Sequence, residues 1–132
     1  MYNKVHIIDD DEISIFLTET ILDVENFSKE FKGFLSAQDA LEELVLTLET
    51  KQYQNLPDLL FLDLNMPFMS GWDLLDALSP YEQDLQNKCR IFILTSSVDA
   101  VELKRAEQYK LVAGFLQKPL EEDALEKIRK MV

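Results

Sequence analysis

Acidic side chains that could hold a cation or attack phosphorus follow two short apolar runs of the sequence. Asp9 and Asp10 come directly after the run at residues 5–8, and Asp63 follows the run at residues 59–62. If both runs are parallel strands of one sheet, their carboxylates meet at its carboxyl edge. Two unit charges about 4 Å apart repel by roughly 4 kcal/mol at an effective dielectric constant near 20. Either one carboxyl is protonated or a cation lies among them, and oxygen ligands with an open, hydrated sphere suit Mg²⁺ better than zinc.

Two further polar residues follow apolar runs in the same way. Thr95 comes after residues 91–94, and Lys118 lies just past residues 111–116. A lysine charge, a hydroxyl and a metal around one carboxylate are the ingredients of phosphoryl transfer, which depends on positioning and on neutralising oxygen charge. Asp63 is then the natural nucleophile, because a carboxylate that attacks phosphorus forms an acyl phosphate.

These residues require a sheet that brings them to one edge. The four apolar runs are continuous rather than alternating, which is typical of parallel strands covered on both faces. A fifth candidate, residues 30–35, alternates more and contains Lys32 and Gly33, as an edge strand would. Helical stretches lie between the strands. Five strands alternating with five helices predict an α/β fold in which a parallel sheet lies between two helical layers. With the strand order 2-1-3-4-5, Asp9, Asp10 and Asp63 belong to the two strands at the switch point.

Apolar residues at helical spacing predict which faces of the first two helices pack on the sheet. The predicted faces are Ile13, Phe16, Leu17, Ile21 and Val24 in the first helix, and Leu41, Leu44, Val45 and Leu48 in the second. Three serines, each with Asp three residues further on, are predicted N-caps: Ser36, Ser70 and Ser96. We expect Pro80 to end the third helix and residues 121–131 to form the last. Residues 49–54 and 80–88 are either helix extensions or surface connections.

Composition limits the class of protein. The 132 residues are expected to form one domain, residues 1–132, and the net charge of −12, from 13 basic and 25 acidic residues, disfavours direct nucleic-acid binding. The single Cys89 permits no internal disulfide and is expected to fill the core. A lone cysteine fits a reducing compartment, so we expect a cytoplasmic protein. The absence of a long apolar run or a signal-peptide pattern disfavours membrane insertion and secretion.

Four motifs in order give the chain a family resemblance. They are Ile7-Ile8-Asp9-Asp10-Asp11, Ile93-Leu94-Thr95-Ser96, Phe115-Leu116-Gln117-Lys118-Pro119 and the long stretch from Phe61 to Gly71, which contains Asp63-Leu64-Asn65-Met66-Pro67. Together they resemble the signatures of two-component response-regulator receiver domains, of the single-domain, chemotaxis-regulator-like kind. The resemblance spans the whole chain and implies a flavodoxin-like, doubly wound sheet of five parallel strands in the order 2-1-3-4-5, with helices on both faces.

The resemblance implies a role for each matching residue. Asp63 would be phosphorylated, and Mg²⁺ would be bound by Asp10, Asp63 and the backbone carbonyl of Asn65, with Asp9 assisting through water. Thr95 would hydrogen-bond the phosphoryl group and Lys118 would pair with it. Phe115 matches the switch aromatic that changes rotamer together with the threonine, but it lacks the hydroxyl of a tyrosine. The Lys118-Pro119 bond is expected to be cis.

The implied function is a phosphoacceptor switch in a two-component phosphorelay. Asp63 would accept phosphate from a histidine kinase or phosphotransfer protein, and the domain would promote its own phosphorylation and dephosphorylation without being an enzyme in the usual sense. The acyl phosphate would shift a two-state equilibrium at the face around the fourth and fifth helices. No output domain follows Val132. The effect then passes to an unidentified downstream protein by direct contact, unless the chain is a piece of a longer protein.

Two other functions share part of this pattern. A flavin-binding module can use the same topology, but its phosphate cradle would be repelled by Asp9-Asp10-Asp11-Glu12. A metal-dependent phosphatase would share the nucleophile but needs a second acid where Asn65 stands.

Several residues near the motifs have simpler interpretations. Asp11 and Glu12 are predicted to cap a helix rather than to bind metal. Asp58 precedes its strand and is therefore predicted at the opposite edge of the sheet. His6 is predicted to be a packed strand residue, and Trp72 to pack on the sheet rather than to bind a partner. Ser96 and Ser97 offer hydroxyls near the phosphate, and Asn65 and Ser97 are expected to influence how long it persists.

Overall fold

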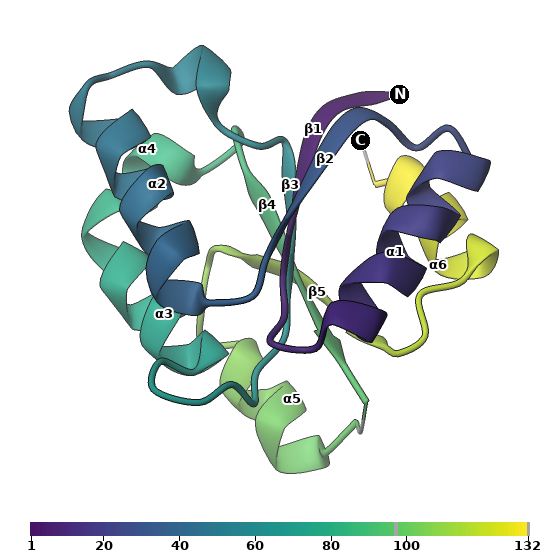
Figure 1. Cartoon of the computed structure of the whole chain (residues 1–132). Helices are drawn as coiled ribbons and strands as arrows, with labels where there is room; N and C mark the ends of the chain where they lie inside the picture. Colours follow the sequence, from purple (N-terminus) through teal and green to yellow (C-terminus); the bar gives the residue numbers. More distant parts are fainter. Residues whose placement is uncertain (97, 132) are drawn as a thin grey trace.

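Five parallel strands form the central sheet of the computed structural model, which describes residues 1–96 and 98–131 (Figure 1). The strands run in the spatial order β2-β1-β3-β4-β5, so the predicted order is confirmed. Every neighbouring pair is parallel, with Ile8 opposite Leu62 across β1 and β3. The strand bounds are β1 Tyr2–Ile8, β2 Ser28–Phe34, β3 Leu59–Leu62, β4 Arg90–Thr95 and β5 Val112–Gln117.

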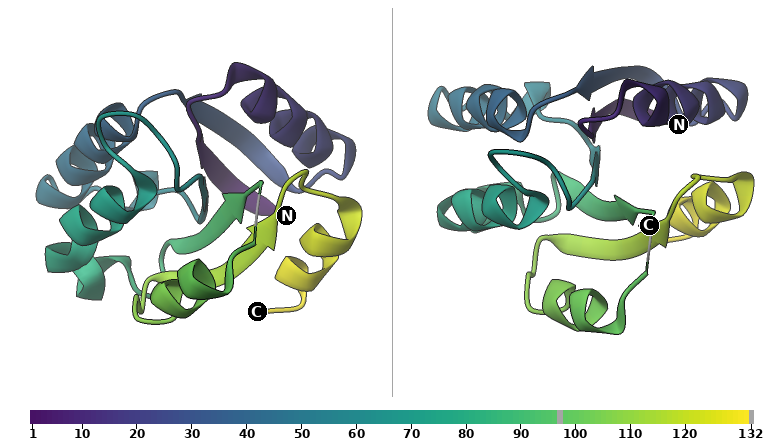
Figure 2. Two further views of the ribbon diagram at one scale, coloured as in Figure 1. Left: turned by 90° about the horizontal axis from the view of Figure 1, so that it is seen from below. Right: turned by 60° about the horizontal axis from the view of Figure 1, so that its bottom comes forward.

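Helices cover the two faces of the sheet unequally (Figures 1 and 2). One face carries α1 (Glu12–Val24) and α6 (Glu122–Arg129). The other carries α2 (Ala37–Glu49), α3 (Gly71–Leu78), the short α4 (Glu82–Leu85) and α5 (Ala100–Ala106). Alternate strand residues feed two separate apolar cores, because successive side chains of a strand point to opposite faces. Ile8 and Leu62 belong to the core under α2 and α3, whereas Ile7 and Phe61 belong to the core under α1 and α6.

Two of the three predicted N-caps are confirmed. The Ser36 hydroxyl accepts a hydrogen bond from the backbone N–H of Asp39, and Ser70 and Asp73 form a reciprocal capping box at the start of α3. The prediction for Ser96 is wrong. Asp99 caps α5 by accepting from the Val101 N–H at 2.7 Å, because a carboxylate directly before the first turn satisfies the free N–H groups and favours the helix dipole.

The predicted packing face of α1 is also wrong. Ile15, Thr18 and Leu22 are buried, whereas most of the predicted face is exposed. Two local contacts explain why α1 buries a different face from the predicted one. Ile15 packs where Gly33 of β2 has no side chain, since a Cβ there would lie 2.6 Å from Ile15 Cγ2. Thr18 can be buried because its hydroxyl donates to the Ser14 carbonyl at 2.9 Å. In α2, by contrast, Leu44 and Leu48 are buried as predicted.

The polar connections are partly helical. The third helix ends at Leu78, and Pro80 lies in the following 3₁₀ turn, Ser79–Tyr81, which leads into α4. A second 3₁₀ turn covers Tyr53–Asn55. Trp72 and Cys89 are buried as predicted. Among residues 1–96 and 98–131, none of the helices combines the length and apolar character that crossing a membrane requires.

His6 is buried in β1, as the sequence predicts. Its ring packs edge-on against Phe34 at 5.0 Å between centroids, and its Nε2 lies 3.7 Å from a carboxylate oxygen of Glu43. The Nδ1 atom is buried and has no hydrogen-bond partner among the described residues. Burial lowers the pKa of His6 from 6.5 to about 4 despite the nearby Glu43, so the imidazole is neutral in the folded protein near pH 7.

This buried imidazole predicts acid sensitivity. Between pH 6.5 and 4 the unfolded chain protonates His6 while the folded chain does not, so stability falls as the pH falls through this window. The full effect is roughly 3 kcal/mol. We expect His6→Leu to lose less free energy of unfolding than the parent between pH 7 and 4, as measured by urea denaturation. His6 is the only histidine, so its NMR titration is unambiguous. A midpoint near 6.5 in the native state would contradict the prediction.

Candidate functional site

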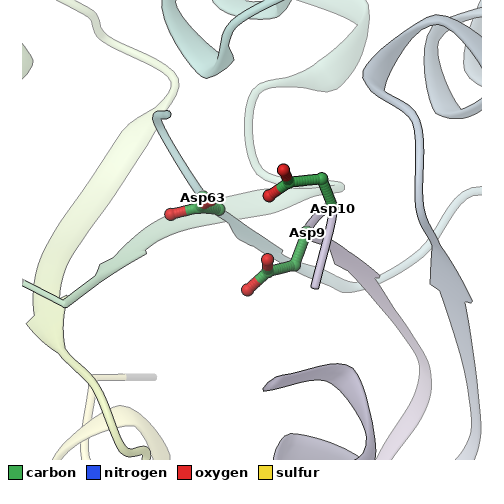
Figure 3. A group of neighbouring side chains, drawn as sticks. All are labelled: Asp9, Asp10 and Asp63. Carbon is green, nitrogen blue, oxygen red and sulfur yellow. The ribbon is translucent and has the colours of Figure 1, made fainter. Parts of the chain in front are cut away.

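Three carboxylates meet at the carboxyl edge of the sheet (Figure 3). Asp9 and Asp10 follow β1, Asp63 follows β3, and one oxygen of each lies within 4.8 Å of the others. Backbone hydrogen bonds hold them there, because the Asp63 N–H donates to the Ile8 carbonyl and the Asp9 N–H donates to the Phe34 carbonyl. Asp9 and Asp63 are buried, whereas Asp10 is exposed. The site is therefore built into the sheet and opens to solvent on the Asp10 side.

Lys118 supplies positive charge to this cluster. Its Nζ donates to Asp9 Oδ2 at 2.5 Å and lies 3.6 Å from Asp63 Oδ1. The Lys118 N–H donates to the Thr95 carbonyl at 2.7 Å, which ties the end of β5 to the end of β4. The Lys118-Pro119 peptide bond is cis, as predicted. Lys118, which directly follows β5, therefore bridges the carboxylates that follow β1 and β3.

The electrostatics of the site disfavour the ionised form of Asp63. Burial and the neighbouring charges of Asp9 and Asp10 raise the pKa of Asp63 from 3.8 to about 6, even though Lys118 opposes the shift. Burial alone would lower the pKa of Lys118. The hydrogen bond to Asp9 and the charges of Asp63 and Asp9 outweigh it and hold that pKa above its ordinary value. The pocket thus has excess negative charge that a cation would relieve.

Of the other predicted site residues, Thr95 and Asn65 lie at this edge, whereas Phe115 lies within β5. Thr95, the last residue of β4, is buried, and Asn65 is exposed two residues past Asp63. Phe115 is opposite Ile93 in the β4–β5 register and packs, half-buried, against the core under α2 and α3. Their roles as phosphate, metal and switch residues stay predictions. Ser97 lies outside the described residues.

The residues with simpler interpretations are where they were predicted to be. Asp11 caps α1 by accepting from the Ile13 N–H, and Glu12 is an exposed first-turn residue. Asp58 lies at the opposite edge of the sheet, where its carboxylate accepts from the Asn3 N–H at 2.6 Å. None of these three belongs to the cluster of carboxylates that could hold an ion among the described residues.

Two features of the loop after Asp63 were not predicted. A Cβ on Gly71 would lie 2.5 Å from the Asp63 carbonyl oxygen, so only glycine lets α3 begin this close to the site. Phe68 has φ of 67° and is fully exposed. A left-handed backbone is a strained choice for an aromatic residue. The sequence signal for Gly71 was its place directly after the N-cap Ser70. Phe68 gives no such signal.

Comparison with known families matches residues 5–130 to the response regulator receiver domain. An uncharacterized response regulatory protein of Staphylococcus epidermidis is 34% identical over 125 residues, which cover 95% of this chain and 44% of that protein. This chain thus spans less than half the length of that curated relative.

Solved structures of several such proteins have the same fold. A two-component response regulator from Cytophaga hutchinsonii has a TM-score of 0.87 at 29% identity, covering 98% of this chain and 95% of that one. A receiver protein from Dyadobacter fermentans has a TM-score of 0.81 at 26% identity, covering 96% and 94%. The receiver domain of the Arabidopsis thaliana histidine kinase CKI1, complexed with Mg²⁺, has a TM-score of 0.81 at 22% identity, covering 98% and 92%.

The raised pKa of Asp63 predicts that its charge destabilises the fold. Between pH 3.8 and about 6 the native state binds a proton that the unfolded chain has released, so ionising this carboxyl above pH 6 costs stability. We expect Asp63→Asn to be more stable than the parent at pH 7 by up to about 3 kcal/mol, and this gain to vanish near pH 4. Urea denaturation in metal-free buffer at both pH values measures it. A gain that is independent of pH, or a loss at pH 7, would contradict this assignment.

Proposed function

The chain belongs to the response regulator receiver family, whose members are signalling phosphoacceptors rather than catalytic enzymes, and we propose that it is a switch phosphorylated on Asp63. We further propose that residues 1–132 form one receiver domain. The observation that carries the proposal is the convergence of Asp9, Asp10 and Asp63 with Lys118 at one sheet edge. Such a cluster has no evident structural use, because it places like charges together where burial disfavours them.

The proposed reaction transfers a phosphoryl group from a phosphohistidine to Asp63. A carboxylate oxygen of Asp63 forms the new O–P bond while the P–N bond to the donor imidazole breaks, and that nitrogen keeps the electron pair. Lys118 is 3.6 Å from Asp63 Oδ1, close enough to pair with an oxygen of the incoming group. Thr95 would donate its hydroxyl to another oxygen. The buried site holds these donors before the phosphoryl group arrives, which limits the reorganisation that the reaction requires.

The donor set fits Mg²⁺. Three carboxylate oxygens within 4.8 Å of one another, one of them on an exposed residue, give a hard oxygen site that leaves room for water. The raised pKa of Asp63 is what repulsion and burial produce when the pocket has too little positive charge. Asp10, Asp63 and the Asn65 carbonyl would hold the ion, with Asp9 assisting through water. When bound, Mg²⁺ would neutralise charge on the phosphoryl oxygens.

Phosphorylation would shift a two-state equilibrium through Thr95 and Phe115. These residues lie on adjacent strands, and Phe115 is only half-buried beside α5, so a change of its rotamer would alter the face formed by α5, β5 and α6. We propose that a downstream protein reads this face by direct contact. The donor would be a histidine kinase or a phosphotransfer protein, and the compartment the cytoplasm, in keeping with the free, buried Cys89.

Phosphorylation by a small-molecule donor tests the proposal. We expect acetyl phosphate with Mg²⁺ to add the mass of one phosphoryl group to the intact protein. The adduct should be absent after EDTA treatment and in Asp63→Asn, because the nucleophile or its metal is then missing. Lys118→Ala should slow its formation by roughly 100-fold, the usual cost of losing one donor to transition-state charge. Intact mass spectrometry over time measures each rate.

A matched control tests whether the reaction depends on the carboxylates of the site or on any carboxylate of this acidic protein. Asp58→Asn removes a carboxylate at the opposite sheet edge and should react like the parent. An adduct that persists in Asp63→Asn, or no adduct on the parent chain, would overturn the proposal. Sustained hydrolysis of a generic phosphate ester would point instead to the phosphatase alternative. A coloured purified protein would point to the flavin alternative.

A further inference from the structure

A pocket lies at the amino edge of the sheet, at the other end of the strands from the carboxylate cluster. Arg90 begins β4 there, and its N–H donates to the Asp58 carbonyl at 3.0 Å, whereas Thr95 ends the same strand at the carboxylate edge. The pocket has a volume of about 250 Å³ and is lined by the turn after α4, the starts of β4 and β5, and the segment after α6. We call it the β4–β5 pocket.

The β4–β5 pocket has side chains suited to an anion. Gln86, Asn87, Arg90 and Lys110 line it, and none of the described residues in its wall is acidic. All four side chains carry N–H donors, and two of them are cations. This lining stands out in a chain that has 25 acidic residues and only 13 basic ones. The pocket therefore offers both hydrogen-bond donors and positive charge.

The guanidinium of Arg90 has an unmet need for a partner. Its Nη1 atom is buried and has no hydrogen-bond partner among the described residues. Within residues 1–96 and 98–131, neither Arg90 nor Lys110 forms an ion pair with a carboxylate. A buried donor left unpaired costs folding free energy, and arginine is well suited to two-point contact with phosphate oxygens. An anion in the β4–β5 pocket would supply the missing acceptor.

The backbone around the β4–β5 pocket departs from regular structure at two points. Ile91 pairs with Val112 but Phe92 pairs with Gly114, so Ala113 is an extra residue in β5. Such a bulge is rare between parallel strands, and bulges often lie beside functional sites. Asn87 has φ of 68°, in the left-handed region. Because Ala113 and Asn87 both line the pocket, these irregularities shape its wall.

Apolar side chains complete the wall and indicate what the anion carries. They are Leu111, Ala113 and Met131, of which Met131 is 46% exposed. A free oxyanion would contact only the donors and would leave this apolar surface in water. An ester would bury its organic group there and gain the free energy of removing apolar surface from water.

We propose that the β4–β5 pocket is a binding site for a small phosphate monoester, separate from the phosphoacceptor Asp63. Arg90 and Lys110 pair with the phosphate oxygens, and the organic group of the ester packs against Leu111 and Met131. The ligand is held by noncovalent contacts alone. Because the site contains no carboxylate, binding does not require Mg²⁺.

An NMR titration with phenyl phosphate tests the proposal, in buffer that contains EDTA and has constant ionic strength. We expect saturable shifts of the backbone amides at residues 86–90 and 110–113. Arg90→Gln and Lys110→Gln should each raise the Kd by at least about tenfold, because each removes a charged hydrogen-bond donor to the phosphate. Lys110 is exposed, so Lys110→Gln tests the site even if Arg90→Gln does not fold.

Two control variants separate this site from general charge and from the phosphoacceptor site. Lys88→Gln makes the same change of charge in the neighbouring turn, but Lys88 does not line the pocket and its ammonium lies 5.4 Å from the centre of the Tyr53 ring. Its Kd should stay within about twofold of the parent value. Asp63→Asn should also bind phenyl phosphate like the parent.

Inorganic phosphate distinguishes an ester site from a site for the free anion. It should bind at least about fivefold more weakly than phenyl phosphate, because it has no ring to bury against the apolar wall. Equal affinity for the two probes would overturn the ester assignment in favour of free phosphate.

Three other results would overturn the site itself. They are shifts that do not saturate, equal losses of affinity in Lys88→Gln and Lys110→Gln, and shifts that centre on residues 63 and 118. Each is independent of whether acetyl phosphate labels Asp63, so failure of this proposal and failure of the phosphoacceptor assignment are distinguishable.

Discussion

Repulsion among Asp9, Asp10 and Asp63 is the constraint on which the site depends. Parallel pairing of β1 with β3 forces the carboxylates together, since the residues after Ile8 and Leu62 leave the sheet side by side. The fold cannot relieve the repulsion by moving them, because sheet hydrogen bonds fix Asp9 and Asp63. The fold can offset the repulsion only by placing positive charge nearby, and Lys118 supplies part of that charge. Burial, together with the repulsion from Asp9 and Asp10 that remains, raises the pKa of Asp63. The same excess of negative charge makes a divalent cation fit this pocket.

Much of the fold could be predicted because buried parallel strands have a strong sequence signal. The run at residues 59–62 is apolar at every position, so its bounds were predicted to the residue, whereas the strand order was implied by the family resemblance. The orientation of α1 could not be predicted in this way. Apolar residues occur around most of its circumference, so periodicity alone does not choose a face. Which face of α1 packs on the sheet depends on the space left by Gly33 in β2, and only the packed structure reveals that space.

The acidic site was predictable for the same reason as the strands, since residues that directly follow them share an edge. Pairings within the edge were not predictable. Lys118 was expected to pair with the phosphoryl group on Asp63. In the structure its Nζ hydrogen-bonds Asp9 Oδ2 and lies farther away, at 3.6 Å, from Asp63 Oδ1. A lysine side chain reaches several carboxylates from one backbone position, so burial and desolvation decide which it bonds. The close approach of Gly71 to Asp63 and the left-handed backbone of Phe68 depend on the path of the loop after β3. The spacing of residues in the sequence does not predict that path.

Two violations of local preference lie five residues apart along the chain, at and just after the phosphoacceptor position. Asp63 is a buried acid with a raised pKa, and Phe68 is an exposed aromatic residue in a left-handed conformation. Each costs folding free energy, and sequences that fold well usually keep such conflicts for functional sites.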